Sequence, residues 1–154
     1  MNYGDIMSTK KFLISIIIIG FFVLIISKYL LQICVVRGIS MQPTLYDKTL
    51  ILIKKYKFQI HSGNIAVIKK NNKIIIKRVV GIPGDKLQIK GGYLYVNGKK
   101  YDNYYIVYSG ILENEIELNY NEYFVLGDNK NQSIDSRYEE IGIIYKNEFI
   151  GIKM

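Results

Sequence analysis

The sequence predicts a mainly β domain, built as an antiparallel barrel-like or two-sheet structure, that follows one N-terminal transmembrane helix. Three observations lead to this prediction. A long apolar run lies near the N-terminus, and the remaining sequence is rich in short β-branched and aromatic segments that partly alternate in polarity. Clusters of Gly, Asn and Asp divide these segments. The 154 residues suit one compact domain plus an anchor.

The apolar run over residues 12–26 reads FLISIIIIGFFVLII and contains no charge. At 1.5 Å per residue this run makes about 22 Å of helix, which is shorter than a bilayer core. The apolar sequence resumes after Lys28, so a helix over residues 12–31 is long enough to span. We therefore expect a short N-terminal segment at 1–11, an anchor at 12–31 and a β-rich domain at 35–154.

Two other interpretations of the apolar run compete with the anchor. A cleaved secretory signal peptide has the same layout, but no small-residue pair of the Ala-x-Ala kind closely follows the run. A buried core helix is disfavoured because a helix that is apolar all round is hard to cover in so small a domain. Charge does not decide the orientation: Lys10 and Lys11 favour a cytoplasmic N-terminus, but Lys28 and Arg37 lie on the other side.

The strands are expected in short segments after residue 48. These segments are TLILIKK (49–55), GNIAVIKK (63–70), KIIIKRVVGI (73–82), DKLQIK (85–90), GYLYVNGK (92–99), IELNYNEYFVLG (116–127) and NEFIGIKM (147–154). Asn97-Gly98 predicts a hairpin, because this pair supplies the positive φ angles of a type I′ turn. The stretch 102–117 is the least regular and is interpreted as an exposed loop.

Composition argues against several classes of function. The net charge of +8 suits anionic lipid as well as nucleic acid, and the scattered lysines form no recognition helix or RNA-binding signature. Nucleic acid is therefore not expected as a partner. The single cysteine, Cys34, has no partner for an internal disulfide, and paired zinc ligands are absent, so neither a metal nor a cofactor is expected.

Three segments have the composition of a reactive site. RGISMQPTL (37–45) places a serine in a turn directly after the anchor, IIIKRVVGIPGD (74–85) places Lys77 in an apolar strand, and GDNKNQSIDSR (127–137) is polar. A buried lysine can lose its proton, whereas arginine cannot, and a neutral amine can activate a serine hydroxyl. Taken singly, the three segments would be a turn, a strand and a loop. The only histidine, His61, leaves a Ser-His-Asp triad as the competing arrangement.

Together the three motifs, in this order after an anchor, resemble the bacterial type I signal peptidases, in their short form with one N-terminal anchor. The resemblance runs from the anchor to Arg137. It implies a β-rich peptidase domain outside the cytoplasm, a cytoplasmic N-terminus and a single pass through the plasma membrane. It also implies a serine endopeptidase that cleaves signal peptides from secreted preproteins after small residues, as in Ala-x-Ala. Its partners would be these signal peptides and the bilayer, with the secretion translocon as a further candidate.

The resemblance assigns roles to individual residues. Ser40 matches the nucleophile and Lys77 the general base. Ser133 matches the hydroxyl that orients the lysine amine, and Asp135 and Arg137 match a supporting ion pair.

Further supporting roles follow from the same motifs. Met41 and Pro43 match residues that shape the nucleophile turn. Ile75 and Ile76 match the strand that lines the substrate groove, and Ile134 is expected beside the lysine at that groove. The turn that opens the third motif is interpreted as structural: Gly127, Asp128 and Asn129.

The sequence departs from the family pattern at three positions. Gly38 replaces a serine whose hydroxyl, in some members, helps to bind the oxyanion, so the backbone N–H of Ser40, alone or together with that of Gly38, is expected to bind it. Lys130 replaces an arginine, and Asn64 replaces an aspartate at a strand start. These changes leave the Ser–Lys pair intact.

The sequence leaves other functions open. The anchor argues against the self-cleaving repressors that use Ser and Lys on a similar scaffold. A conjugation-associated peptidase of the same clan is an alternative, and so is an inactive membrane-tethered β-module that binds secretion components. Cleavage of a preprotein separates the enzyme from the inactive module.

Overall fold

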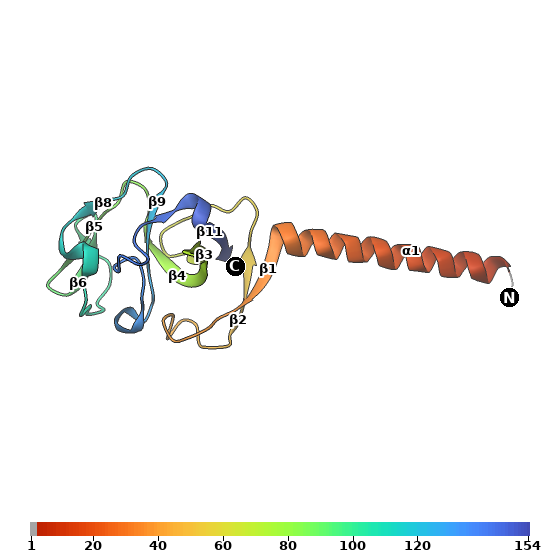
Figure 1. Ribbon diagram of the computed structural model, residues 1–154, viewed down its shortest axis with the longest axis horizontal. Helices are drawn as coiled ribbons and strands as arrows, with labels where there is room; N and C mark the ends of the chain where they lie inside the picture. The colour runs from red at the N-terminus through yellow and green to blue at the C-terminus, as the bar shows by residue number, and fades with distance from the viewer. Residues whose placement is uncertain (1–2) are drawn as a thin grey trace.

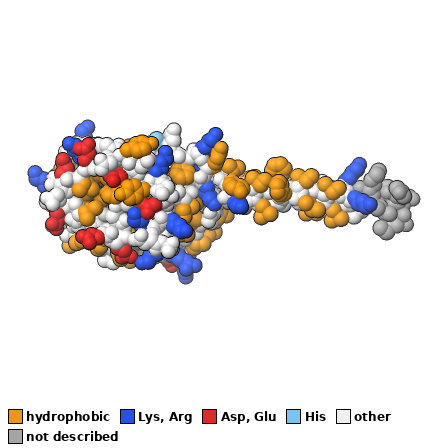
Figure 2. Space-filling model, turned by 45° about the horizontal axis from the view of Figure 1, so that its top comes forward, with side chains coloured by type: hydrophobic (Ala, Val, Ile, Leu, Met, Phe, Trp, Pro, Cys, Tyr) orange, Lys and Arg blue, Asp and Glu red, His pale blue; other side chains and the backbone are white. Residues whose placement is uncertain are grey.

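The computed structural model describes the backbone of residues 3–154 and the side chains of residues 9–26 and 28–154. Helix α1 (Tyr3–Ile25) projects from the β domain as a rod and continues as a π-helical segment, Ile26–Leu30 (Figure 1). Hydrophobic side chains lie along this rod, between basic side chains near the outer limit of its described side chains and others where it meets the β domain (Figure 2).

The segment Thr9–Leu30 is long and apolar enough to cross a membrane, with a mean hydropathy of 2.5 and 0% of its most apolar stretch buried inside the protein. A helix that is apolar all round and unburied has the properties of a membrane anchor, and the anchor bounds of 12–31 stay a prediction. Part of the N-terminal segment predicted at 1–11, residues 1–2, lies outside the described residues. The helix already begins at Tyr3.

The β domain begins earlier than the sequence indicated. Strand β1 (Leu31–Val35) pairs antiparallel with β2 (Leu50–Lys54), from Leu31 opposite Lys54 to Val35 opposite Leu50. The apolar sequence thus forms a helix followed by strand β1. Its last residues form a strand because they pair with β2, which lies further along the chain. Lys55 Nζ donates a 2.9 Å hydrogen bond to the Lys28 carbonyl, which ties β2 to the end of the helix.

The part of the chain that the structure describes forms two antiparallel sheets, which confirms the predicted fold class. The larger sheet has the order β1-β2-β11-β3-β4-β9-β10, and the smaller has the order β7-β6-β5-β8. The remaining strands are β3 (Ile65–Lys70), β4 (Lys73–Gly81), β5 (Lys86–Lys90), β6 (Tyr93–Val96), β7 (Lys99–Lys100), β8 (Ile116–Glu117), β9 (Glu122–Leu126), β10 (Ile144–Tyr145) and β11 (Phe149–Lys153). Short 3-10 helices span Gly110–Glu113, Lys130–Gln132 and Lys146–Glu148.

Local turn chemistry follows the prediction at the β6–β7 hairpin. Asn97 and Gly98 have φ angles of 52° and 73°, the positive values that a type I′ turn requires. The loop 102–117 differs from the exposed loop that was expected. Ile106 and Leu112 are 2% and 0% exposed and pack in the core of the smaller sheet, so this loop is held against the domain.

Candidate active site

Ser40 lies on a turn that leaves the larger sheet after β1. Two apolar side chains of this turn, Met41 and Leu45, are buried in a core cluster with residues of β2 and β3. The Gln42–Pro43 peptide bond is cis. The buried Met41 and Leu45 fix the turn that carries the half-buried Ser40, whereas Pro43 is exposed and its expected role stays a prediction.

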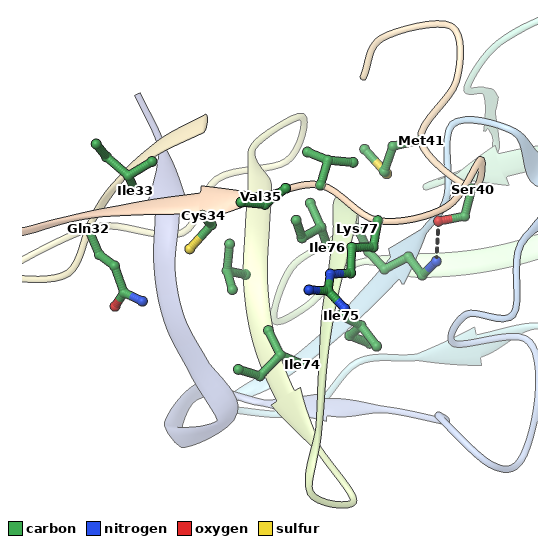
Figure 3. A pocket seen from close by; sticks show the side chains of 13 residues that line it. Gln32, Ile33, Cys34, Val35, Ser40, Met41, Ile74, Ile75, Ile76 and Lys77 are labelled. Atoms are coloured by element: carbon green, nitrogen blue, oxygen red, sulfur yellow. Dashed lines mark hydrogen bonds between the residues drawn. The ribbon is translucent and has the colours of Figure 1, made fainter. Parts of the chain in front are cut away.

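Lys77 reaches Ser40 from strand β4. Its Nζ lies 2.9 Å from Ser40 Oγ, within hydrogen-bond distance (Figure 3). The Lys77 side chain is only 5% exposed, and burial lowers its pKa because an ammonium loses solvation in an apolar setting. The negative charge of Asp135 partly opposes this lowering of the pKa, and the positive charge of Arg137 adds to it.

A groove of about 460 Å³ runs from this pair between β1 and β4. Ile75 and Ile76 line it, as expected, and Cys34 lines it from β1. Ser40 and Lys77 lie at one end of the groove and Gln32 lies at the other (Figure 3).

Ile134 does not line this groove, which corrects the prediction for it. Its side chain is 56% exposed. The neighbouring side chains of Ser133 and Asp135 are buried, and successive side chains of extended backbone point to opposite sides, so Ile134 points outward.

Asp135 and Arg137 form the ion pair that was expected. Arg137 Nε lies 2.8 Å from Asp135 Oδ1, and Nη2 lies 2.9 Å from Oδ2, with both side chains buried. The carboxylate has a further contact, since Asp135 Oδ2 accepts a hydrogen bond from the Gly127 N–H. Among the described residues, Asp135 forms no hydrogen bond with Lys77.

Ser133 is buried beside the site, but its hydroxyl has no hydrogen-bond partner among the described residues. The hydrogen bond expected from Ser133 to the lysine amine is therefore absent in this arrangement. A Cβ atom at Gly127 would lie far inside contact distance of Ser133 Oγ and 2.5 Å from the Ser40 carbonyl oxygen. Glycine at 127 thus lets the third motif approach the nucleophile turn closely.

Gly38 has a φ of 85°, in the region that glycine favours, and its N–H donates a 2.8 Å hydrogen bond to Asp47 Oδ1. This bond corrects the expectation that the Gly38 N–H binds the oxyanion, because the donor is already engaged. The Ser40 N–H has no acceptor among the described residues, so it is available as a donor at the nucleophile.

Residues adjacent in sequence to the site form ion pairs that the sequence did not predict. Arg78 donates two 2.7 Å hydrogen bonds to the Asp128 carboxylate and one to the Gly63 carbonyl. Lys130 pairs with Asp102 at 2.7 Å. Arg78 stood next to Lys77 in the motif and was a visible candidate, but no local signal connects Asp102 with residue 130.

His61 lies apart from this constellation. It is exposed in a turn, where its backbone N–H donates to Asn64 Oδ1, and it is not among the residues that line the groove. The arrangement brings lysine rather than histidine to the serine hydroxyl.

Comparison with known proteins gives a consistent result. The family model described as "Signal peptidase, peptidase S26" matches residues 9–154. A signal peptidase I of Bacillus amyloliquefaciens is 32% identical over 151 residues, which cover 89% of this chain and 81% of the relative. Signal peptidase I U of Bacillus subtilis (strain 168) is 34% identical, covering 90% and 81%. Signal peptidase IB of Staphylococcus aureus (strain N315) is 32% identical, covering 92% and 85%.

Proposed function

The chain belongs to the signal peptidase family, peptidase S26, and is a serine endopeptidase of the signal peptidase I type; on this premise we propose that Ser40 is its nucleophile and Lys77 its general base. The observation that carries the proposal is the 2.9 Å contact between Lys77 Nζ and Ser40 Oγ, made by a lysine that is 5% exposed. Burial favours the neutral amine, which can accept the serine proton.

In the proposed reaction, the Lys77 amine removes the Ser40 hydroxyl proton while Oγ attacks the scissile carbonyl carbon. The oxyanion forms next to the Ser40 N–H, which has no acceptor among the described residues. The resulting ammonium gives its proton to the leaving amine, and the acyl-enzyme forms. The amine, neutral again, takes a proton from water while the water oxygen attacks the ester carbon. The ammonium returns this proton to Ser40 Oγ as the ester bond breaks, which releases the new carboxyl terminus and regenerates Ser40.

Supporting residues act on the amine and on the loop that faces it. We assign Ser133 the role of orienting the amine, which is supported by its buried and unpaired hydroxyl. Asp135 and Arg137 hold that loop and do not exchange protons with the substrate. This assignment is supported by the pairing of Asp135 with Arg137.

The proposed substrate is the signal peptide of a secreted preprotein, bound extended in the groove and cut after small side chains. Ile75 and Ile76 support this specificity, because bulky aliphatic walls leave shallow pockets beside the Ser–Lys pair. The helix Thr9–Leu30 supports a single-pass location in the plasma membrane. The proposed orientation, with the N-terminus in the cytoplasm and the peptidase domain outside, follows from membership of the family. The secretion translocon is a candidate partner.

The testing experiment compares the full-length protein with Ser40→Ala on a preprotein in detergent or vesicles. Wild type is expected to yield a shortened product and Ser40→Ala none. A second preprotein, with Phe in place of the Ala just before the cut, should resist cleavage. Intact preprotein in every arm would favour an inactive module, and equal cleavage of the Ala and Phe preproteins would contradict the small-residue specificity.

A further inference from the structure

Asn129, a residue of the third motif that has so far been treated as part of a structural turn, contacts the nucleophile turn twice. Its backbone N–H donates to the Ser40 carbonyl at 3.0 Å. Its side-chain Nδ2 donates to the Ile39 carbonyl at 3.4 Å. These two carbonyls belong to successive peptide groups, one on each side of the Ser40 Cα.

The Ile39 contact has a direct geometric consequence. The Ile39 carbonyl and the Ser40 N–H are parts of one peptide group, and in a planar trans peptide the C=O and N–H bonds point in opposite directions. The Ile39 oxygen also accepts from the Gln42 N–H at 3.1 Å within the turn, so Asn129 adds a second donor from outside the turn; together they hold this oxygen and aim the Ser40 N–H to the opposite side. That N–H has no acceptor among the described residues, whereas the Gly38 N–H is bound to Asp47.

The orientation of the Asn129 amide is itself set by a neighbour. The Tyr104 hydroxyl donates to Asn129 Oδ1 at 3.4 Å, which leaves Nδ2 to face the Ile39 carbonyl. The Tyr104 ring in turn lies 4.7 Å from Lys130 Nζ, and Lys130 pairs with Asp102. The loop that follows β7 is thus connected, through Tyr104 and Asn129, to the peptide group of the nucleophile.

We infer that Asn129 is a positioning residue that fixes the Ile39–Ser40 peptide so that the Ser40 N–H is directed at the developing oxyanion, with Tyr104 setting the orientation of the Asn129 amide. This inference rests on the proposed function. A donor that is preorganised in this way acts on the transition state, because the charge it stabilises appears only there.

The experiment measures kcat and KM of the full-length protein on a peptide with Ala at the first and third positions before the cut. Asn129→Asp is nearly isosteric and still accepts from Tyr104, but it cannot donate to the Ile39 carbonyl. Asn129→Ala removes both side-chain contacts. Loss of one oxyanion donor typically lowers kcat about 10²–10³-fold, so a misaimed donor should lower kcat by roughly 10- to 100-fold. In Asn129→Ala, which adds no charge, KM and the pH at which the rate rises should stay close to wild type, because the groove and Lys77 are untouched.

Asn131→Ala is the matched control. Asn131 lies in the same motif and holds the same loop, accepting from the Val107 N–H at 3.1 Å and donating to the Tyr105 carbonyl at 3.1 Å, but it has no hydrogen bond to the nucleophile turn among the described residues. It should lose thermal stability and keep its kcat. Equal kcat values for Asn129→Asp, Asn129→Ala and Asn131→Ala, each folded by thermal melting, would overturn the inference.

Tyr104→Phe tests the second link. It should lower kcat in the wild-type background and have no further effect in Asn129→Ala, because its influence passes through the amide. An equal loss in both backgrounds would overturn the role of Tyr104. Ser40→Ala separates a failure of the proposed function from a failure of the inference. If Ser40→Ala still cleaves, the proposed function is wrong. If Ser40→Ala is inactive while the Asn129 variants are fully active, only the positioning role of Asn129 is wrong.

Discussion

Arg137 donates two parallel hydrogen bonds, of 2.8 Å and 2.9 Å, to the carboxylate of Asp135, and neither side chain is exposed by more than 1%. The guanidinium also donates to the backbone carbonyls of Lys130, Ser133 and Tyr108. Because these carbonyls lie on both the third motif and the loop 102–117, the pair braces the segment that carries Ser133.

Asp135→Asn should therefore lower stability and activity together. Removing one partner of a buried pair leaves the other charge uncompensated, at a cost of about 3–5 kcal/mol. Urea unfolding and preprotein cleavage, measured on the same preparation, check this. A variant that keeps full stability but has no turnover would point to a direct catalytic role for Asp135.

The activity should rise with pH along a limb well below the value for free lysine, about 10.4, because burial lowers the pKa of Lys77. Lys77→Arg should be inactive at every pH, since guanidinium does not lose its proton in proteins. Loss of the base should cost about 10²–10⁴-fold or more in rate. A pH–rate profile checks this, with His61→Ala as the control expected to match wild type. If Lys77→Arg keeps its activity and His61→Ala loses it, the Ser-His-Asp triad that uses His61 is the correct assignment.

The same burial should make Lys77 a destabilising residue. Below about pH 10.4 the unfolded chain binds the Lys77 proton more tightly than the folded chain, since the folded pKa is lowered. The contribution of Lys77 to the free energy of unfolding thus rises as the pH increases from the folded pKa to the unfolded pKa, by about 1.4 kcal/mol for each pH unit between them.

Lys77→Met should then raise the unfolding free energy near neutral pH while abolishing cleavage. Urea unfolding of both proteins as a function of pH gives the test. The stability difference should shrink as pH approaches about 10.4, the pKa of an unperturbed lysine, and a difference that does not change with pH would contradict the lowered pKa.

Gly127→Ala should strongly impair cleavage. The added methyl group would collide with Ser133 and with the Ser40 carbonyl, so the third motif and the nucleophile turn must separate. Gly142→Ala is the control: its φ of 57° strains alanine by about 1–2 kcal/mol, but its nearest neighbour, the Glu139 carbonyl oxygen at 3.7 Å, allows ordinary contact. The control should lose stability with little change in turnover, and similar activities for the two variants would exclude the steric mechanism.

Truncation directly before Leu31 should remove the anchor and leave the β domain intact. A chain that starts at Leu31 keeps β1 whole and should be soluble and active on a peptide, whereas a chain that starts at Val35 loses most of the pairing between β1 and β2. Thermal melting and peptide cleavage distinguish the two. The full-length protein should resist extraction from membranes by carbonate, and its release would contradict a spanning helix.

Much of the fold could be predicted from the sequence because its determinants are local. The pair Asn97-Gly98 favours positive φ angles by its own residue types, and the apolar run after Phe12 is long and uncharged whether or not a domain follows. The boundary at Leu31 could not be predicted, because whether residues 31–35 continue the helix or form a strand depends on β2, which arrives later in the chain.

At the site, the amino-acid sequence limits which chemistry is available: one serine in a turn, one lysine in an apolar strand, and a polar third motif in family order. How these groups meet is set by the folded chain. Folding places Lys77 Nζ against Ser40 Oγ, engages the Gly38 N–H with Asp47, and turns Ile134 to the outside. It also brings Asn129 to the Ile39–Ser40 peptide across 90 positions of sequence. The physical reason is that hydrogen bonds and burial act over a few ångströms in space, and sequence spacing does not encode those distances between separate strands and loops.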